Sequence, residues 1–376
     1  MFAKRNLPSL LIGLVAGLSA VGWPAIGPGQ AQSPKSFLDI CQSRDRLSPA
    51  ARHTLEVLLE TLQETDCETV NSLVLSSDNL TLNNSRIEDI SILASLMHLT
   101  ELYLGDNQIT EIAALSELTN LTVLSLDGNE LSDITPLNQL VNLQALYLNR
   151  NNITDLTALS SLSQLQELHL SHNAIQNLQA LASLDNLEYL YLSNNQIADL
   201  SPLSESLNLS VLELDQNQLS RLDGISNLQN LTILRLDSNV VSSIQPLANL
   251  ANLIELDIDN NPILESDRLP IEHIINLRRV QRKHVCPNCN FAGLDLNTAD
   301  LIGVNLRGAD LSGTNLQNSD LVGANLEAAN LSNADLSGAD LSNANLLNAV
   351  LEGTRLDNTN LCEALLPDGG VGSCMP

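Results

Sequence analysis

Leucine, isoleucine and asparagine recur along the middle of the chain at a fixed interval of 22 residues. A typical block reads Leu99-x-x-Leu102-x-Leu104-x-x-Asn107-x-Ile109. Apolar and polar residues alternate around Leu102 and Leu104, which predicts a short strand with one buried face. Each block therefore predicts one strand followed by a turn.

The asparagines of these blocks form a regular column. They are Asn107, Asn129, Asn151, Asn173, Asn195, Asn217, Asn239 and Asn261. An earlier block, with Ser85 in place of asparagine, gives about nine units over residues 80–264. One unit buries too little to fold alone, so the pattern predicts stacked units with parallel strands on a concave side. Ile112 and Leu115 would fill the returning side in short helical or 3₁₀ turns, and each asparagine amide would bond backbone groups at the turn.

From residue 289 the repeat shortens to five residues. Clear copies are Ala299-Asp300-Leu301, Ala309-Asp310-Leu311, Ala324-Asn325-Leu326, Ala334-Asp335-Leu336 and Ala339-Asp340-Leu341. About fifteen such units cover residues 289–362. A second solenoid is therefore expected after the first.

Both patterns resemble known repeat families. The 22-residue block is similar to the short bacterial leucine-rich repeats of internalin-like proteins, and the five-residue unit resembles pentapeptide repeats. The resemblance implies an α/β solenoid, a leucine-rich repeat horseshoe, followed by an all-β right-handed quadrilateral β-helix. In that β-helix the central leucine and the small residue two positions earlier would point inward, and Asp, Asn and Ser outward. The combination resembles secreted cyanobacterial proteins with both repeats.

The ends and the junction show different patterns. Residues 1–31 resemble a signal peptide, because Lys4 and Arg5 precede an apolar run and Ala31 offers a cleavage site; an uncleaved anchor is the weaker alternative. Three more segments are expected to cover the ends of the solenoids. They are an N-terminal helical cap at 32–79 with a helix over 48–65, a helical junction at 265–288 with a helix over 269–280, and a tail at 363–376.

Six cysteines follow the predicted cleavage site: Cys41, Cys67, Cys286, Cys289, Cys362 and Cys374. An oxidising compartment would pair them, and Cys41 with Cys67 is the most plausible bond. The other four allow three pairings. Cys286-Pro-Asn-Cys289 could also be a zinc half-site or a redox dithiol, but no second ligand pair or thioredoxin-like pattern accompanies it. We therefore predict structural disulfides, no metal site and no cofactor.

Charge narrows the list of partners. The chain has 44 acidic residues against 17 Lys and Arg, a net charge of −27, which opposes binding to nucleic acid. The resemblance to pentapeptide-repeat proteins, some of which resemble a DNA duplex, offers mimicry of DNA as a second interpretation of their acids, but an exported protein would not use it; a solvated face is the simpler interpretation. No apolar run of 18 residues follows the first, so no membrane insertion is expected after cleavage.

Aromatic residues form only 2% of the chain, yet all four tyrosines fall on the concave side of the predicted sheet. The exposed position between the strand leucines reads Thr81, Tyr103, Ser125, Tyr147, His169, Tyr191, Glu213, Arg235 and Asp257, with Tyr189 in the adjacent column. Tyrosine provides contact area at low entropic cost. We therefore predict a ligand-binding aromatic patch beside the charged residues Glu213, Arg235 and Asp257. Alternatively, tyrosine merely suits exposed strand positions.

The sequence thus predicts a secreted, periplasmic or cell-envelope protein that binds a protein or peptide without catalysis, with a glycan as the second choice of ligand. A structural envelope scaffold without a discrete ligand is one alternative. The other is a hydrolase that uses Glu167, His169 and His172, although the spacing implies no nucleophile and no third metal ligand.

Overall fold

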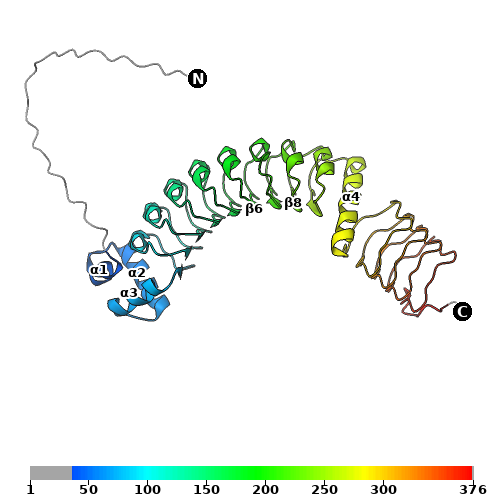
Figure 1. The fold of residues 1–376 in the computed structure, drawn as a ribbon, viewed down its shortest axis with the longest axis horizontal. Coiled ribbons are helices and arrows are strands. Elements are labelled where there is room, and N and C mark those ends of the chain that lie inside the picture. The colour runs from blue at the N-terminus through cyan, green and yellow to red at the C-terminus, as the bar shows by residue number, and fades with distance from the viewer. Residues whose placement is uncertain (1–35, 375–376) are drawn as a thin grey trace, which may run out of the picture. The chain divides into compact units, whose positions relative to one another are not determined.

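The computed structural model describes residues 36–374, and the predicted signal peptide lies outside this range. The described chain begins with helices, continues as a stack of parallel strands, and ends in five-residue repeats (Figure 1). The helices before the stack are α1 (Phe37–Gln42), η1 (Arg44–Arg46), α2 (Pro49–Leu62) and α3 (Cys67–Ser76).

Helix α2 begins where the sequence predicts. The Ser48 side chain accepts the N–H of Ala51, and Pro49 occupies the first turn, where its missing N–H costs nothing. The sequence did not predict α1 or α3, which are only 6 and 10 residues long. The disulfide between Cys41 and Cys67 joins these two helices. The three helices therefore form a linked unit at the first strand.

Nine parallel strands of three residues follow, and they pair in sequence order. The strands are β1 (Asn79–Thr81), β2 (Glu101–Tyr103), β3 (Val123–Ser125), β4 (Ala145–Tyr147), β5 (Glu167–His169), β6 (Tyr189–Tyr191), β7 (Val211–Glu213), β8 (Ile233–Arg235) and β9 (Glu255–Asp257). Figure 1 shows them on the inner side of a curved array, with the helical turns opposite.

The returning segments are 3₁₀ helices, as the sequence predicts. They are η2 (Ser91–Ser95), η3 (Ala113–Glu117), η4 (Thr135–Gln139), η5 (Thr157–Ser161), η6 (Gln179–Ser183), η7 (Ser201–Leu203), η8 (Ile225–Asn227) and η9 (Gln245–Asn249). Leu102 and Leu104 from the strand side and Ile112 and Leu115 from the turn side are buried in one continuous core. The strands are therefore held from behind by apolar packing, which leaves their other face free.

Helix α4 (Glu265–Lys283) follows the last strand and is longer than the predicted 269–280. Acidic residues occupy its first turn and Arg282 and Lys283 its last turn, so charges of both signs complement the helix dipole. The residue after its end, His284, caps it with a left-handed backbone, at a φ of 52°.

The five-residue repeats form a β-helix with four units per coil, because parallel bridges join residues 20 apart, as in Asn305 to Asn325. The central leucines and the small residues two positions earlier are buried between Leu301 and Leu346, as the resemblance implies. Each face contributes a single-residue bridge rather than an extended strand. The outward Asp and Asn side chains instead accept backbone N–H groups two residues ahead, as Asp310 does from Ser312 at 3.0 Å. These contacts shape the turns between faces.

Candidate ligand-binding face

The concave face of β1–β9 presents three columns of side chains, because alternate residues of a strand share a face. The middle column contains Tyr103, Tyr147, His169 and Tyr191, which we call the aromatic column. The strand register aligns these residues in one row, since Tyr147 pairs with His169 and His169 with Tyr191. Tyr189 lies in the neighbouring column, where it pairs with Glu167 and is exposed.

Three rings of the aromatic column lie in contact along the row, with His169 stacked on Tyr191 and tilted against Tyr147. The centroid of His169 lies 4.6 Å from that of Tyr147 and 4.1 Å from that of Tyr191, and its ring is nearly parallel to the latter. The Nε2 atom of His169 bonds Glu167 Oε1 at 2.8 Å. Both faces of the imidazole are thus covered by tyrosine rings.

Carboxylates lie beside these rings. Tyr103 donates its hydroxyl to Glu101 at 2.9 Å. Partial burial and the nearby Glu167 raise the pKa of Tyr147 to about 12, so its hydroxyl remains a donor at neutral pH. Glu101 was missing from the prediction, and Glu167 was named only for the hydrolase alternative, although each lies two residues before an aromatic residue of its strand and so on the same face. The alternation of side chains along each strand therefore already indicated that these glutamates lie on the concave face.

Of the charged residues predicted beside the aromatic patch, Arg235 pairs with Glu213, and its second partner is Glu255, which was not among them. Arg235 Nε lies 3.1 Å from Glu213, and its Nη2 lies 2.7 Å from Glu255. Asp257 occupies the same row on the last strand. Burial raises the pKa of Asp215, and Asp257 and Glu213 add to the effect by repulsion. The single guanidinium of Arg235 thus leaves an acidic surface at this end of the face.

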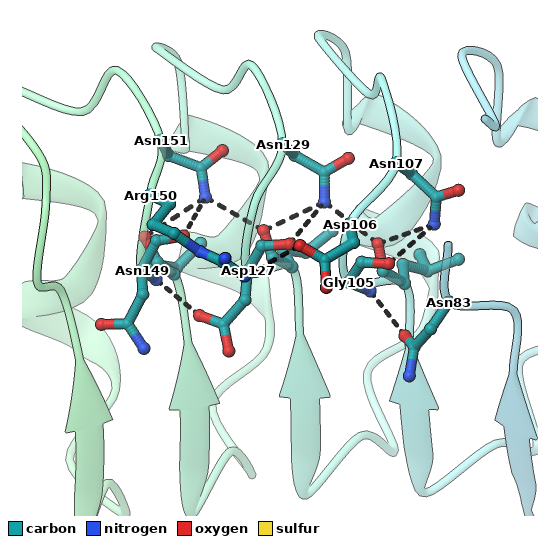
Figure 2. A network of polar contacts seen from close by, with 12 residues as sticks. Asn83, Gly105, Asp106, Asn107, Asp127, Asn129, Asn149, Arg150 and Asn151 are labelled. Atoms are coloured by element: carbon teal, nitrogen blue, oxygen red, sulfur yellow. Dashed lines mark hydrogen bonds and ion pairs between the residues drawn. The ribbon is translucent and has the colours of Figure 1, made fainter. Parts of the chain in front are cut away.

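The asparagine column supports the face from the adjoining turns (Figure 2). The Nδ2 atom of Asn129 donates to the carbonyls of Leu104 and Leu126 at 3.0 Å each, and its Oδ1 accepts the N–H of Ile109 at 3.0 Å. A second ladder runs along the third concave column, where Asp127 accepts the N–H of Asn149 at 2.6 Å. These bonds link successive repeats, so the strands form a rigid platform.

The cysteines form structural disulfides, as predicted, and the structure decides between the three pairings that the sequence left open. Cys286 pairs with Cys289 and Cys362 with Cys374, so the cysteines of the junction and the tail form two local disulfides. His172 lies in a turn with φ of 60°. In the described part of the chain, His169 makes its side-chain hydrogen bond to Glu167 and none to a Ser or Cys side chain, whereas a nucleophile and base need such contact. The arrangement is suited to contact with a ligand.

Within residues 36–374, no helix combines the length and the apolar composition needed to cross a membrane.

Comparison with known proteins identifies the two arrays. Leucine-rich repeats match residues 78–117, 119–161 and 163–205, and pentapeptide repeats match residues 289–327 and 329–366. The chain is therefore a tandem-repeat protein built from two kinds of solenoid.

Solved structures similar to the first array include internalins. Internalin C2 from Listeria monocytogenes is 33% identical over 56% of this chain and 92% of its own, with a TM-score of 0.52. Another internalin from that species is 27% identical over 61% of this chain and 89% of its own, with a TM-score of 0.39. A leucine-rich repeat protein from Leptospira interrogans is 26% identical over 53% and 59%, with a TM-score of 0.49. No curated protein sequence matches the chain.

The chain belongs to the internalin-like leucine-rich repeat proteins and carries pentapeptide repeats after them.

Proposed function

We propose that this chain is an extracytoplasmic, non-catalytic protein that binds a protein or peptide ligand on the concave face of its leucine-rich repeats. The stack of Tyr147, His169 and Tyr191 carries this proposal. Large aromatic side chains dominate the energetics of protein interfaces, and their hydroxyls add polar contacts. Three rings in contact on one row of the strand face offer a partner a large surface for apolar contact.

The rigidity of the face supports the same role. Every strand pairs with its neighbours, and the asparagine ladder fixes the turns behind the rings. A pre-organised surface loses little conformational entropy on binding, so more of the contact energy becomes affinity. In Figure 1 no helix of the described chain covers the strand face, which leaves it accessible to a partner.

Location and chemistry follow from separate features. Three disulfides are characteristic of an oxidising compartment, which agrees with the predicted signal peptide. The rings of Tyr147 and Tyr191 cover both faces of His169, and Glu167 occupies its Nε2. A carboxylate on one imidazole nitrogen can also orient a catalytic base, but in the described part of the chain no Ser or Cys side chain bonds this ring to act as its nucleophile. Ligand binding therefore explains this histidine better than hydrolysis does.

The test is affinity capture from envelope and secreted fractions of the host with three versions of the full chain. The first is wild type. The second is a triple variant that combines Tyr103→Ala, Tyr147→Ala and Tyr191→Ala. The third is a control that combines Gln139→Ala, Ser160→Ala and Ser183→Ala on the opposite 3₁₀ turns. Circular dichroism checks that all three fold. We expect one partner to be enriched by wild type and by the control but lost with the tyrosine variant.

Equal recovery by all three versions, or recovery of nothing, would contradict the proposal. The structural scaffold without a discrete ligand would then be the better description. Turnover of a standard esterase, peptidase or glycosidase substrate that disappears with His169→Ala would instead favour the hydrolase alternative.

A further inference from the structure

The aromatic column is interrupted at one position. Tyr103 and Tyr147 stand on β2 and β4, and the strand between them carries Ser125 at the aligned position. Neighbouring strands lie roughly 4.8 Å apart, so the two tyrosines are anchored about 9.5 Å apart, with a small side chain between them. We call this position the open rung.

Elsewhere in the same column, a side chain occupies the position between two tyrosines. Tyr147 and Tyr191 are also two strands apart, and the imidazole of His169 lies between them, stacked on the ring of Tyr191 at 4.1 Å and tilted by 37° against that of Tyr147 at 4.6 Å. Its nitrogen bonds a carboxylate of the same concave face, that of Glu167. A flat nitrogen-bearing group between two tyrosines, paired with a neighbouring acid, is therefore an arrangement that this scaffold already supports.

The surroundings of the open rung define the chemistry of its occupant. Asp127 lies two residues after Ser125 and shares its face of the sheet. Its Oδ1 accepts the N–H of Asn149, which leaves Oδ2 for another donor. Arg150, the cation next to Asn149 along the chain, pairs with Asp106 at 2.8 Å instead. The rung is therefore flanked by two tyrosines and by a carboxylate that forms no ion pair in the described chain, although the charges of His169 and Arg150 act on it from a distance.

We propose that the open rung receives an arginine side chain of the partner, stacked between Tyr103 and Tyr147 and paired with Asp127. This inference rests on the proposed function, because it assigns a specificity element to the same concave face. The guanidinium would lie about 4.8 Å from each ring, inside the roughly 6 Å range of cation–π contacts. The net charge of −27 agrees with a cationic ligand.

Arginine fits this place better than lysine or an aromatic residue. The guanidinium is planar, so it stacks on two rings at once, and it donates in its own plane to a carboxylate. An ammonium is compact and strongly hydrated and has no flat face. A phenyl ring would stack equally well but would cover Asp127 and leave its carboxylate unpaired. Burial already raises the pKa of Asp127, so a cation there would relieve a cost that the free protein carries.

Fluorine NMR of the full chain labelled with 3-fluorotyrosine tests the assignment, since its four tyrosines give four resonances. The probes are acetyl-Gly-X-Gly-amide peptides in which X is arginine, lysine, phenylalanine or citrulline, the neutral planar analogue of arginine. We expect the arginine peptide to shift Tyr103 and Tyr147 with Kd of about 1 mM, a value typical of a single side-chain contact, and to leave Tyr189 unmoved. The other three peptides should bind at least about fivefold more weakly.

Four variants of the chain sharpen the result. Ser125→His places an imidazole in the rung, as at the aligned His169, and should abolish the arginine-dependent shifts. Ser125→Ala leaves the rung open and should bind the arginine peptide as wild type does. Ser193→His adds the same bulk three strands away and should also bind the arginine peptide as wild type does. Asp127→Asn keeps an acceptor for Asn149 but removes the charge, and should weaken the arginine peptide about tenfold without changing citrulline binding.

Arginine-dependent shifts that persist in Ser125→His would overturn the proposal, as would stronger binding of the phenylalanine peptide or no shift of Tyr103 and Tyr147 at 10 mM arginine peptide. These outcomes leave the proposed function separately testable. Suppose that wild type captures a partner, the triple tyrosine variant loses it, and Ser125→His binds it fully. Binding on the concave face would then stand, and only the assignment of arginine to the open rung would be rejected.

Discussion

At the scale of single residues, each repeat asparagine satisfies backbone groups of its own unit and of the unit before it. Asn129 donates to Leu104 O and Leu126 O and accepts from the N–H of Ile109, and its side chain is only 7% exposed. Water cannot replace these bonds, because the groups lie beneath the turn. The fixed spacing of asparagine therefore follows from hydrogen bonding that every turn of the array requires.

Replacement of Asn129 by alanine should destabilise the protein substantially. Two carbonyls and one N–H would lose their partner in a buried place, so we expect the free energy of unfolding to fall by about 2–4 kcal/mol. Urea denaturation followed by circular dichroism measures the change. Asn152→Ala is the matched control, since this asparagine is exposed and should alter stability by less than about 0.5 kcal/mol. Equal effects of the two substitutions would contradict the role given to the asparagine column.

The half-buried carboxylate of Asp127 should make Asp127→Asn stabilising at neutral pH. Burial raises the pKa of Asp127 above its ordinary 3.8, although the hydrogen bond from Asn149 opposes this effect. Above the folded-state pKa the charge therefore costs stability, and the cost disappears as pH falls through that pKa towards 3.8. We expect a gain of a few tenths of a kcal/mol at pH 7, reduced by solvent screening, and none at about pH 3.

Melting temperatures of wild type and Asp127→Asn at the two pH values measure this difference. A gain that persists or grows in acid would show that the charge of Asp127 is not its source. A stabilising variant that also loses arginine binding would indicate that Asp127 is retained for ligand contact at a cost in stability.

At the scale of elements, helix α4 closes the exposed edge of the last leucine-rich repeat. Arg278 Nη1 donates to Leu250 O at 2.7 Å, and Arg279 Nε donates to Ile254 O at 2.8 Å. An open strand edge would expose unpaired carbonyls and invite association with other chains. The predicted helical junction thus caps the first array with guanidinium groups.

Arg279→Met should weaken this cap. Methionine keeps much of the apolar stem but leaves Ile254 O without its donor, so we expect a loss of about 1–3 kcal/mol in the free energy of unfolding. Arg221→Met is the control, because Arg221 pairs with Asp223 on an exposed surface where ion pairs contribute little. Chemical denaturation compares the two variants. A loss as large for Arg221 as for Arg279 would mean that general charge balance, rather than capping, explains the arginines.

The elements also show how far the sequence determines the structure. The repeat strands and turns were predictable because the same apolar spacing recurs in every unit, and α2 was predictable from Ser48 and Pro49. Helices α1 and α3 were missed because short helices depend on tertiary packing and a disulfide more than on propensity. The aligned row of tyrosines followed from register, whereas the stacking of His169 depends on ring orientations that spacing does not specify.

At the scale of the whole described chain, the two solenoids have separate hydrophobic cores that share one helix. Ile271 and Ile275 of α4 belong to the core of the leucine-rich repeats, while Val280 belongs to the core of the pentapeptide repeats. Arg279 lies between them, with its Nη1 3.5 Å from Cys289 Sγ. Repeat arrays transmit stability only between neighbours, so this helix is the element through which either array can influence the other.

Truncations of the helix side chains should therefore loosen the two arrays separately. Ile275→Ala removes a buried side chain from the first core and should cost about 2–5 kcal/mol, while Val280→Ala should cost about 1–3 kcal/mol in the second. Hydrogen exchange should speed up at least about tenfold in β8 and β9 for Ile275→Ala, and in the first β-helix coil, residues 286–306, for Val280→Ala. Mass spectrometry of peptic fragments locates these changes. If each variant accelerates exchange equally in both arrays, the described chain unfolds as one cooperative unit, and α4 transmits stability between cores that are separate only in their packing.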